Sequence, residues 1–184
     1  VKDVLPTVVK IDVVQIVTQQ AIGSGSPFDF FNSPRGNGNS QPREFRQQGL
    51  GSGVIVQRTG NRVYVLTNNH VVEKAKSLEV SLTDGRTMPA RIIGTDSATD
   101  LAVVRLEANG LPVAELGNSG TLRVGQLVIA IGNPLEFEHT VTVGVVSAFE
   151  RRVQTGIDTE LFGMLQTDAP ITRGSSGGAL VDAE

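Results

Sequence analysis

Apolar and polar residues alternate in many short segments of this chain, and this two-residue period is typical of half-buried β-strands. The first such segment, Thr7–Thr18, is also rich in β-branched residues, which favour strands. The first half of the chain holds further strand patterns at Gly53–Gln57, Arg62–Thr67, Ser77–Leu82, Thr87–Gly94 and Leu101–Leu106. Between them, Thr83–Arg86 has the composition of a tight hairpin turn and Asn69–Lys74 favours one helical turn. Six strands suffice for a small closed antiparallel barrel.

The second half shows the same pattern with fewer strands. After the segment Glu107–Gly125, which is rich in glycine and asparagine, strand patterns occur at Gln126–Ile131, Thr140–Phe149, Phe162–Thr167 and Gly178–Val181. We interpret Arg151–Leu161 as a polar loop. The chain is therefore predicted to be all-β, with a first lobe over residues 1–110, a connector over 111–125 and a four-stranded second lobe over 126–184.

Two N-terminal segments depart from the alternation. Val1–Leu5 has the pattern of a frayed helix end that stops at Pro6. Gln19–Gln48 has no period and contains Phe28, Phe30 and Phe31 among polar residues. Such a long loop is either functional or loosely ordered. We leave open whether the phenylalanines dock on another surface, such as a second subunit, or belong to a loose insertion.

Composition excludes several classes of function. The formal net charge of −3 predicts no binding of nucleic acid or of an anionic membrane. No apolar run approaches the ~20 residues of a membrane-spanning helix, and the opening VKDVLPTVVKID lacks the pattern of a signal peptide, so we expect a mature or trimmed chain. Cysteine is absent, which excludes disulfides and thiolate metal sites. We predict no cofactor and no metal.

A hydroxyl amid glycines, Gly174-Ser175-Ser176-Gly177-Gly178, is the strongest candidate for chemistry. Alone it is typical of a turn, because a serine becomes a nucleophile only beside a base and a group that orients the base. The chain has two histidines, His70 and His139. His70 ends a predicted strand, and Asp100 lies where a polar loop gives way to another strand. Each of these residues alone would more often be structural.

The order of the three residues favours one arrangement. His70 precedes Asp100 by 30 residues and Asp100 precedes Ser176 by 76 residues, which places the first two in the first lobe and the serine in the second. This order is typical of two chymotrypsin-like barrels facing each other across a cleft. Gly174-x-Ser176-x-Gly178 also fits the nucleophile elbow of α/β hydrolases, but that fold places Asp and His after the serine, and only eight residues follow Ser176. We predict His70 as base, Asp100 as its orienting group and Ser176 as nucleophile.

Five motifs in order resemble the HtrA/Deg serine proteases: TNNHVV (67–72), DSATDLAVVRL (96–106), IGNP (131–134), TVTVGVVSA (140–148) and QTDAPITRGSSGGAL (166–180). The resemblance implies two six-stranded antiparallel β-barrels of chymotrypsin type with short helical turns, the second barrel being incomplete in this chain. It implies cleavage of unfolded or misfolded proteins and assigns the same roles to His70, Asp100 and Ser176.

The resemblance also implies roles for neighbouring residues. The backbone N–H groups of Gly174 and Ser176 would form the oxyanion hole, with that of Ser175 assisting. Arg151–Leu161 would be a sensor loop in which Arg151 or Arg152 contacts a peptide-binding regulatory domain. His139, the rival base, falls in what resembles a regulatory loop. Two positions differ from the usual pattern: Ser175 stands where the family has asparagine, and Leu135–Glu138 replaces glycines.

Members of this family continue beyond the position of Glu184 with two more strands and one or two PDZ domains, so we expect this chain to be part of a longer protein. The resemblance implies a homotrimer or larger assembly in the periplasm or cell envelope, and cleavage after small aliphatic residues such as Val or Ala. Pro170 stands six residues before Ser176, where an acid would select basic side chains, so no preference for Arg or Lys is predicted.

Two other functions remain open. An incomplete second barrel would suit a binding or chaperone-like subunit with little proteolysis. The three phenylalanines would suit an interaction scaffold. A serine endopeptidase is the leading interpretation because it uses all three residues of the predicted triad.

Overall fold

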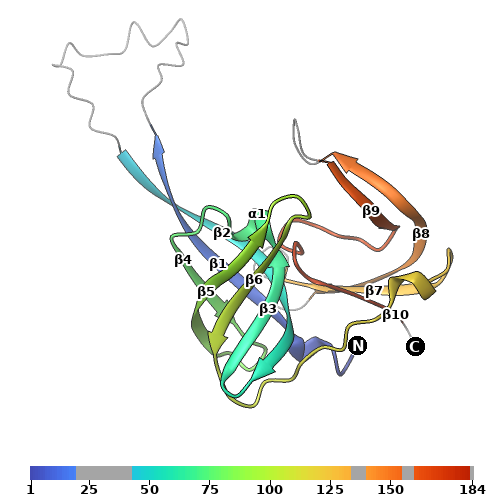
Figure 1. Cartoon of the computed structure of the whole chain (residues 1–184), viewed down its shortest axis with the longest axis horizontal. Coiled ribbons are helices and arrows are strands. Elements are labelled where there is room, and N and C mark those ends of the chain that lie inside the picture. The colour runs from blue at the N-terminus through green and yellow to red at the C-terminus, as the bar shows by residue number, and fades with distance from the viewer. Residues whose placement is uncertain (20–42, 134–139, 155–159, 183–184) are drawn as a thin grey trace, which may run out of the picture.

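The structure, a computed structural model, describes residues 1–19, 43–133, 140–154 and 160–182, with the backbone alone described for 15–19 and 43–48. A closed barrel forms the first half, and a curled four-stranded sheet forms the second (Figure 1). This arrangement confirms the predicted all-β fold of chymotrypsin type with an incomplete second barrel. The patch of Phe28, Phe30 and Phe31, the rival base His139 and the turn Leu135–Glu138 lie outside the described residues. None of the described helices has the length and hydropathy needed to span a bilayer.

The six strands of the first lobe close into one antiparallel barrel with the order β1-β2-β3-β6-β5-β4. Pairing of β1 with β4, in which Ile11 lies opposite Val80, completes the ring. The strands span β1 (Val8–Gln19), β2 (Arg43–Thr59), β3 (Arg62–Asn68), β4 (Ser77–Ser81), β5 (Thr87–Asp96) and β6 (Leu101–Glu107). A short helix, α1 (Asn69–Val72), follows β3, as predicted for this segment.

Alternation along the strands builds the barrel core. On β3 the buried apolar residues are Val63 and Val65, and on β6 they are Ala102, Val104 and Leu106. Their neighbours in sequence face outward, because successive side chains of a strand point to opposite faces. Fully burying a valine or leucine side chain contributes about 1.5–3 kcal/mol. The core is therefore the main source of stability for the scaffold that carries the site.

Two N-terminal predictions were wrong in part. The loop predicted to extend to Gln48 ends earlier, because β2 begins at Arg43 and pairs with Gln19 of β1. The two strands continue as a ribbon that projects from the barrel (Figure 1), where backbone pairing rather than an apolar core defines the strand. Pro6 does not stop a helix, but lies inside the 3-10 helix η1 (Leu5–Thr7), near whose start proline's missing N–H costs little.

The second lobe is an antiparallel sheet with the order β10-β7-β8-β9. A 3-10 turn, η3 (Ser119–Thr121), lies in the connector before it. The strands span β7 (Leu127–Gly132), β8 (Thr140–Gln154), β9 (Glu160–Thr167) and β10 (Ala179–Asp182). Each matches a predicted strand, and β8 and β9 are longer than predicted.

The predicted loop at Arg151–Leu161 was wrong at both ends. Arg151–Gln154 continues β8, and β9 already begins at Glu160. Cross-strand pairs such as Arg151 with Met164 hold this ribbon together, and the Arg152 guanidinium lies 5.2 Å from the Phe162 ring centroid. The sequence did not indicate a strand here because both faces of the ribbon are largely exposed. Polar residues therefore occupy both faces, and the apolar alternation typical of a half-buried strand is missing.

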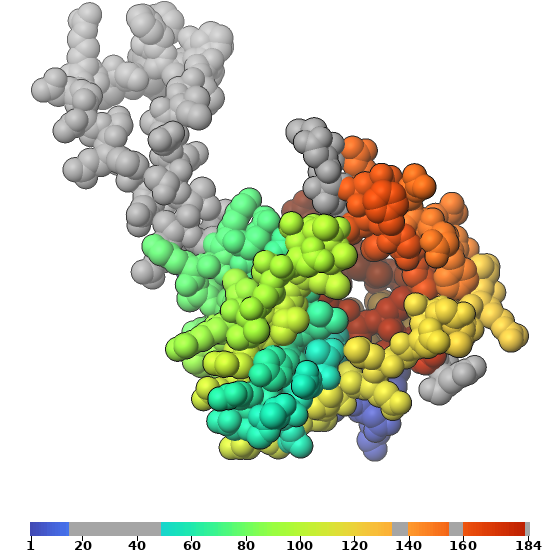
Figure 2. All heavy atoms as spheres, in the orientation of Figure 1, coloured from blue at the N-terminus to red at the C-terminus, as the bar shows by residue number. Residues whose placement is uncertain are grey.

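Apolar side chains remain exposed on the second sheet, in contrast to the barrel. Val143 is 55% exposed and Phe162 is 62% exposed, and Val141, Met164 and Leu180 are exposed as well. In Figure 2 the curled sheet surrounds a hollow beside the barrel, with residues coloured red at its floor. The four strands therefore form an open half-barrel.

Candidate active site

His70 and Asp100 are brought together by two neighbouring strand ends. β3 and β6 pair from Arg62↔Glu107 to Asn68↔Leu101, so the residues that follow β3 and precede β6 meet at the same end of the barrel. The chain turns there into α1, and the Asn69 N–H donates to the Asp100 carbonyl at 3.0 Å. The Asn68 amide donates to the same carbonyl at 2.9 Å. His70 and Asp100, which are 30 residues apart in the sequence, are therefore in direct contact.

The Asp100 carboxylate holds His70 by two hydrogen bonds. Its Oδ1 accepts from the His70 backbone N–H at 2.9 Å, and its Oδ2 lies 2.7 Å from His70 Nδ1. A carboxylate can only accept, so Nδ1 carries the proton and the lone pair of Nε2 is left for other chemistry. The imidazole is 53% exposed and the carboxylate only 17%. The imidazole therefore faces solvent, while the carboxylate that holds it lies behind.

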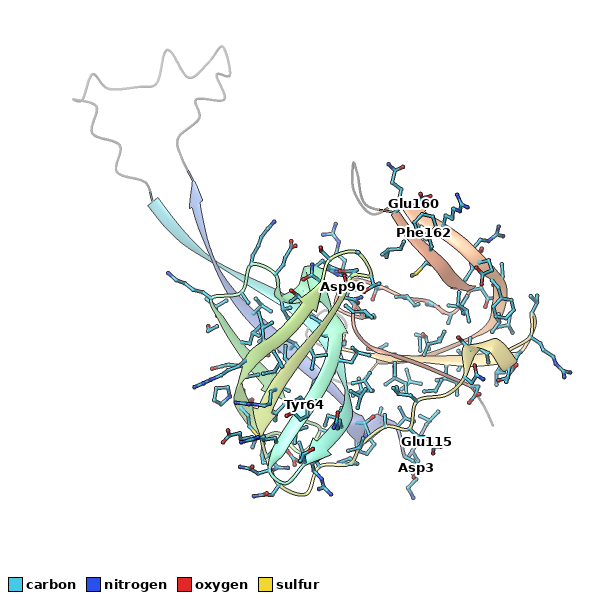
Figure 3. All side chains as sticks on the ribbon, in the orientation of Figure 1. Asp3, Tyr64, Asp96, Glu115, Glu160 and Phe162 are labelled. Atoms are coloured by element: carbon cyan, nitrogen blue, oxygen red, sulfur yellow. The ribbon has the colours of Figure 1, made fainter. Side chains whose placement is uncertain are left out.

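The loop before Asp100 is shaped by Asp96. Its carboxylate accepts from the Thr99 hydroxyl at 2.8 Å and from the Ala98 N–H at 2.9 Å. The hydrogen bond from Thr99, and to a smaller extent the one from Ala98, lowers the pKa of Asp96 from its ordinary value. Figure 3 labels Asp96 on the barrel, near the opening toward the curled sheet. Asp100 itself has φ 55, a left-handed conformation that aspartate tolerates better than most residues.

Ser176 lies in a loop between β9 and β10 that is anchored on both sides. Before the serine, the Asp168 carboxylate accepts from the Val145 N–H at 2.7 Å, and the Thr142 hydroxyl donates to the Pro170 carbonyl at 2.8 Å. Around the serine, the Gly178 N–H donates to the Ser175 carbonyl at 2.8 Å. The loop is thus fastened to β8 and folded on itself.

Ser52 of β2 ties the serine loop to the first barrel. The Ser52 N–H donates to the Ser176 carbonyl at 2.8 Å, and its hydroxyl donates to the Gly174 carbonyl at 2.7 Å. The loop carrying Ser176 is thereby fixed to the same barrel that carries His70 and Asp100. Among the described residues, no hydrogen bond joins the Ser176 hydroxyl to His70.

Gly177 shows how closely the two lobes approach. It has φ 83, and a Cβ at this position would overlap the Ser52 carbonyl oxygen and the Thr67 hydroxyl. Only glycine combines this conformation with the absence of a side chain. Gly177 is therefore required by contact between the lobes, whereas a Cβ at Gly178 would meet Ile131 and Ser175 of the second lobe itself.

The backbone N–H groups around Ser176 differ in whether they already donate a hydrogen bond within the described residues. The Ser175 N–H donates to the Thr172 carbonyl at 3.1 Å. The N–H groups of Gly174 and Ser176 donate to no atom of the described residues. Two such donors beside a serine can stabilise an oxygen that becomes negatively charged.

Arg151 and Arg152 lie apart from the pair formed by His70 and Asp100. The Arg151 Nε donates to the Gln166 side chain at 3.0 Å on the β8–β9 ribbon. Phe162, which packs under the Arg152 guanidinium, is labelled in Figure 3 on the same ribbon. The ribbon continues into the serine loop, because β9 ends at Thr167 immediately before Asp168.

Sequence reasoning missed two residues of this arrangement, Ser52 and Asp168. Ser52 carried only an indirect signal: its neighbours Gly51 and Gly53 mark close packing inside a strand, but they make room for the Val71 and Val65 side chains and not for the serine loop. Asp168 carried none of its own, because its partner is a backbone N–H on a distant strand.

Comparison with known proteins agrees with this geometry. A family model described as a trypsin-like peptidase domain matches residues 51–184. The chain belongs to the trypsin-like peptidase family.

Similar proteins are HtrA/Deg proteases, which confirms the resemblance seen in the motifs. The periplasmic serine endoprotease DegP of Salmonella typhimurium is 40% identical over 200 residues, covering 97% of this chain and 41% of DegP. The serine protease Do-like HtrA of Bacillus subtilis is 41% identical over 177 residues, covering 94% of this chain and 38% of that protein. The solved structure of the HtrA-type protease AlgW with a decapeptide has a TM-score of 0.74 and 37% identity, with 99% of this chain and 54% of that chain covered. The chain thus spans less than half the length of these curated relatives.

Beside the serine loop, this trypsin-like peptidase domain has a small cavity of about 140 Å³. Pro170 and Ile171 line it from the loop, and Ala130 and Ala179 line it from the sheet. No charged side chain lines it among the described residues. The described residues also contain no group of three histidine, aspartate, glutamate or cysteine side chains that could hold a metal ion.

Proposed function

We propose that this trypsin-like peptidase domain is a serine endopeptidase that uses Ser176, His70 and Asp100. The observation that carries the proposal is the 2.7 Å contact between His70 Nδ1 and Asp100 Oδ2, on the barrel to which Ser52 fastens the Ser176 loop. The imidazole is held in the tautomer that a general base needs. The serine whose proton this imidazole would take is Ser176, which lies among glycines.

The reaction is acyl transfer in two stages. Ser176 Oγ attacks the carbonyl carbon of the peptide bond, while His70 Nε2 takes its proton. The carbonyl oxygen becomes an oxyanion and accepts hydrogen bonds from the N–H groups of Gly174 and Ser176. His70 then passes the proton to the leaving amine, and an acyl-enzyme remains. Water then attacks the acyl carbonyl carbon while His70 Nε2 takes its proton. The bond to Ser176 Oγ breaks, the product leaves with a new carboxyl end, and His70 returns the proton to Ser176 Oγ.

The Ser175 N–H, to which the resemblance gives an assisting role, is not used in the mechanism that we propose. It already donates to the Thr172 carbonyl, so a substrate oxygen would have to displace that bond. We therefore keep Gly174 and Ser176 as the oxyanion donors. Asp100 acts through His70, by holding the ring and stabilising its charged form.

We further propose that the substrates are unfolded or misfolded proteins, cleaved after small aliphatic residues. The uncharged cavity beside Pro170 and Ile171 supports a preference for apolar side chains over Lys and Arg. The names of similar proteins, such as periplasmic serine endoprotease DegP, support a periplasmic setting. The same relatives are longer than this chain, which supports a parent protein with further domains, for which we propose a PDZ domain and a homotrimer or larger assembly.

Arg151 and Arg152 are proposed as contacts for such a regulatory domain. Both lie on the ribbon that leads into the serine loop, and both are exposed. A partner that moved this ribbon would reach the loop through β9 and Asp168.

Digestion of casein tests the peptidase function, with the Ser176→Ala variant as control. We expect cleavage by the wild-type protein and none by the variant, and mass spectrometry of the products should show mostly Val or Ala at the new C-termini. Mostly Lys or Arg at these ends would contradict the proposed specificity. Equal inertness of both proteins would contradict the peptidase function.

A binding or chaperone-like activity is the second candidate. It is favoured by the exposed apolar side chains of the second sheet, such as Val143 and Phe162. If both the wild-type protein and Ser176→Ala bind unfolded casein without cutting it, this second function would replace the first.

A further inference from the structure

Ser52 is a fully buried polar residue in the strand β2, with 0% of its surface exposed. A buried hydroxyl costs free energy unless it has hydrogen-bond partners. The Ser52 hydroxyl has partners on both its donor and its acceptor side. Both partners belong to the second lobe, so the residue lies where the two lobes meet.

The direction of these hydrogen bonds is determined by the chemistry of the partners. The Asn133 N–H lies 2.8 Å from Ser52 Oγ and can only donate. The Gly174 carbonyl lies 2.7 Å from the same oxygen and can only accept. The single proton of the hydroxyl must therefore point to Gly174. If the hydroxyl proton pointed in any other direction, one of the two hydrogen bonds would be lost.

This bond completes the restraint of three successive peptide units. The Gly174–Ser175 unit has its carbonyl on Ser52 Oγ and its N–H on the Thr172 carbonyl. The Ser175–Ser176 unit has its carbonyl on the Gly178 N–H, and the Ser176–Gly177 unit has its carbonyl on the Ser52 N–H. Since each peptide unit is planar, holding its carbonyl also sets its N–H.

We propose that Ser52 is a positioning residue for the oxyanion hole. Its hydroxyl holds the Gly174–Ser175 peptide unit. This unit joins the peptide unit that carries the Gly174 N–H to the one that carries the Ser176 N–H, and holding it keeps both N–H groups available to a substrate oxygen. This inference rests on the proposed peptidase function. Because the same hydroxyl accepts from Asn133, it also ties the end of β7 to the loop.

The Ser52→Ala variant tests the proposal in the full-length protein. It removes the hydroxyl and leaves the Ser52 N–H bond to Ser176 in place. Loss of one oxyanion donor lowers turnover about 10²–10³-fold, so we expect kcat on a peptide substrate to fall by about 10². KM should change by less than about twofold, because an interaction made only in the transition state affects kcat. A peptide boronate, whose tetrahedral oxygen occupies the oxyanion hole, should bind more weakly by the same factor as kcat.

Thr67→Val is the matched control. It removes another buried hydroxyl of the same region, which donates to the Ser52 carbonyl at 2.7 Å, and leaves the Gly174 bond intact. We expect lower thermal stability with kcat unchanged. Ser52→Cys is a second test variant, because its weak S–H donor should give a kcat between those of wild type and Ser52→Ala. It also carries the test if Ser52→Ala does not fold.

Unchanged kcat and boronate affinity in Ser52→Ala would overturn the proposal, as would an equal fall of kcat in Thr67→Val. Labelling of Ser176 by a fluorophosphonate separates this failure from failure of the peptidase function. If the wild-type protein is labelled and cleaves peptide while Ser52→Ala behaves identically, only the role of Ser52 is wrong. If the wild-type protein is neither labelled nor active, the peptidase function is wrong, and this inference falls with it.

Discussion

Asp100 accepts hydrogen bonds through three separate groups, and two of these groups hold His70. Its carbonyl accepts from Asn68 and Asn69, and its two carboxylate oxygens contact the backbone and the ring of His70. The left-handed φ of 55 is the local cost of reaching all of them. At the residue scale, one hydrogen bond to Nδ1 thus holds the His70 ring, and the other bonds to Asp100 hold the backbone that carries it.

Replacing Asp100 with asparagine should separate geometry from chemistry. The Asp100→Asn side chain has nearly the same shape, but its amide would donate to His70 Nδ1 and shift the ring proton to Nε2. We expect kcat to fall by roughly 10⁴, as for the same change in other serine proteases. Peptide hydrolysis measures this fall. A melting temperature close to that of wild type would show that the fold is intact, and a kcat within tenfold of wild type would argue against His70 as base.

The β8–β9 ribbon is the element whose local structure departs most from regular sheet. Its register shifts at several points, and Glu150 lies at φ 53 beside one of them. A side chain in this conformation costs roughly 1–2 kcal/mol, which glycine would avoid. A strained residue thus lies in the ribbon that leads to the serine loop.

Glu150→Gly should therefore stabilise the protein. We expect an increase of about 1 kcal/mol in the free energy of unfolding, because glycine adopts a positive φ without steric cost. Urea denaturation measures the change. Glu150→Ala is the matched control, since it removes the same carboxylate but keeps the strain. An equal gain in both variants would show that charge, and not backbone conformation, was responsible.

The whole molecule depends on contact between a closed barrel and a half-barrel. The described contacts at the serine loop centre on Ser52, which bonds to Gly174, Ser176 and Asn133. Gly177 lies against the same strand with no room for a side chain. The proposed active site is therefore assembled by the packing of two lobes, and we expect a defect at this contact to affect both stability and activity.

Gly177→Ala tests that dependence. Its Cβ would overlap the Ser52 carbonyl oxygen, which cannot move without disturbing β2. We expect casein cleavage to be lost and the melting temperature to fall. Gly163→Ala is the control, because Gly163 also has a positive φ of 66 but has open space around it. It should lose only the roughly 1 kcal/mol of conformational strain and keep its activity. Full activity in Gly177→Ala would contradict the assembly of the site by close lobe packing.

Much of this arrangement follows from the sequence alone. Alternating apolar residues determine the strands of the barrel, because each strand buries one face, as Val63 and Val65 do on β3. The order of His70, Asp100 and Ser176 along the chain was enough to predict two facing lobes. The exposed ribbon around Arg151 escaped prediction because no buried face sets a period there.

Tertiary structure alone decided which groups touch. The pairing of β3 with β6 brings His70 to Asp100, and the packing of β2 against the serine loop gives Ser52 its partners. These contacts involve backbone atoms that are far apart in the chain. Because nearly every residue has the same backbone N–H and carbonyl, the residue types do not predict such contacts. The sequence therefore determines which reactive side chains are present, and the packing of the two lobes determines how these side chains are placed relative to one another.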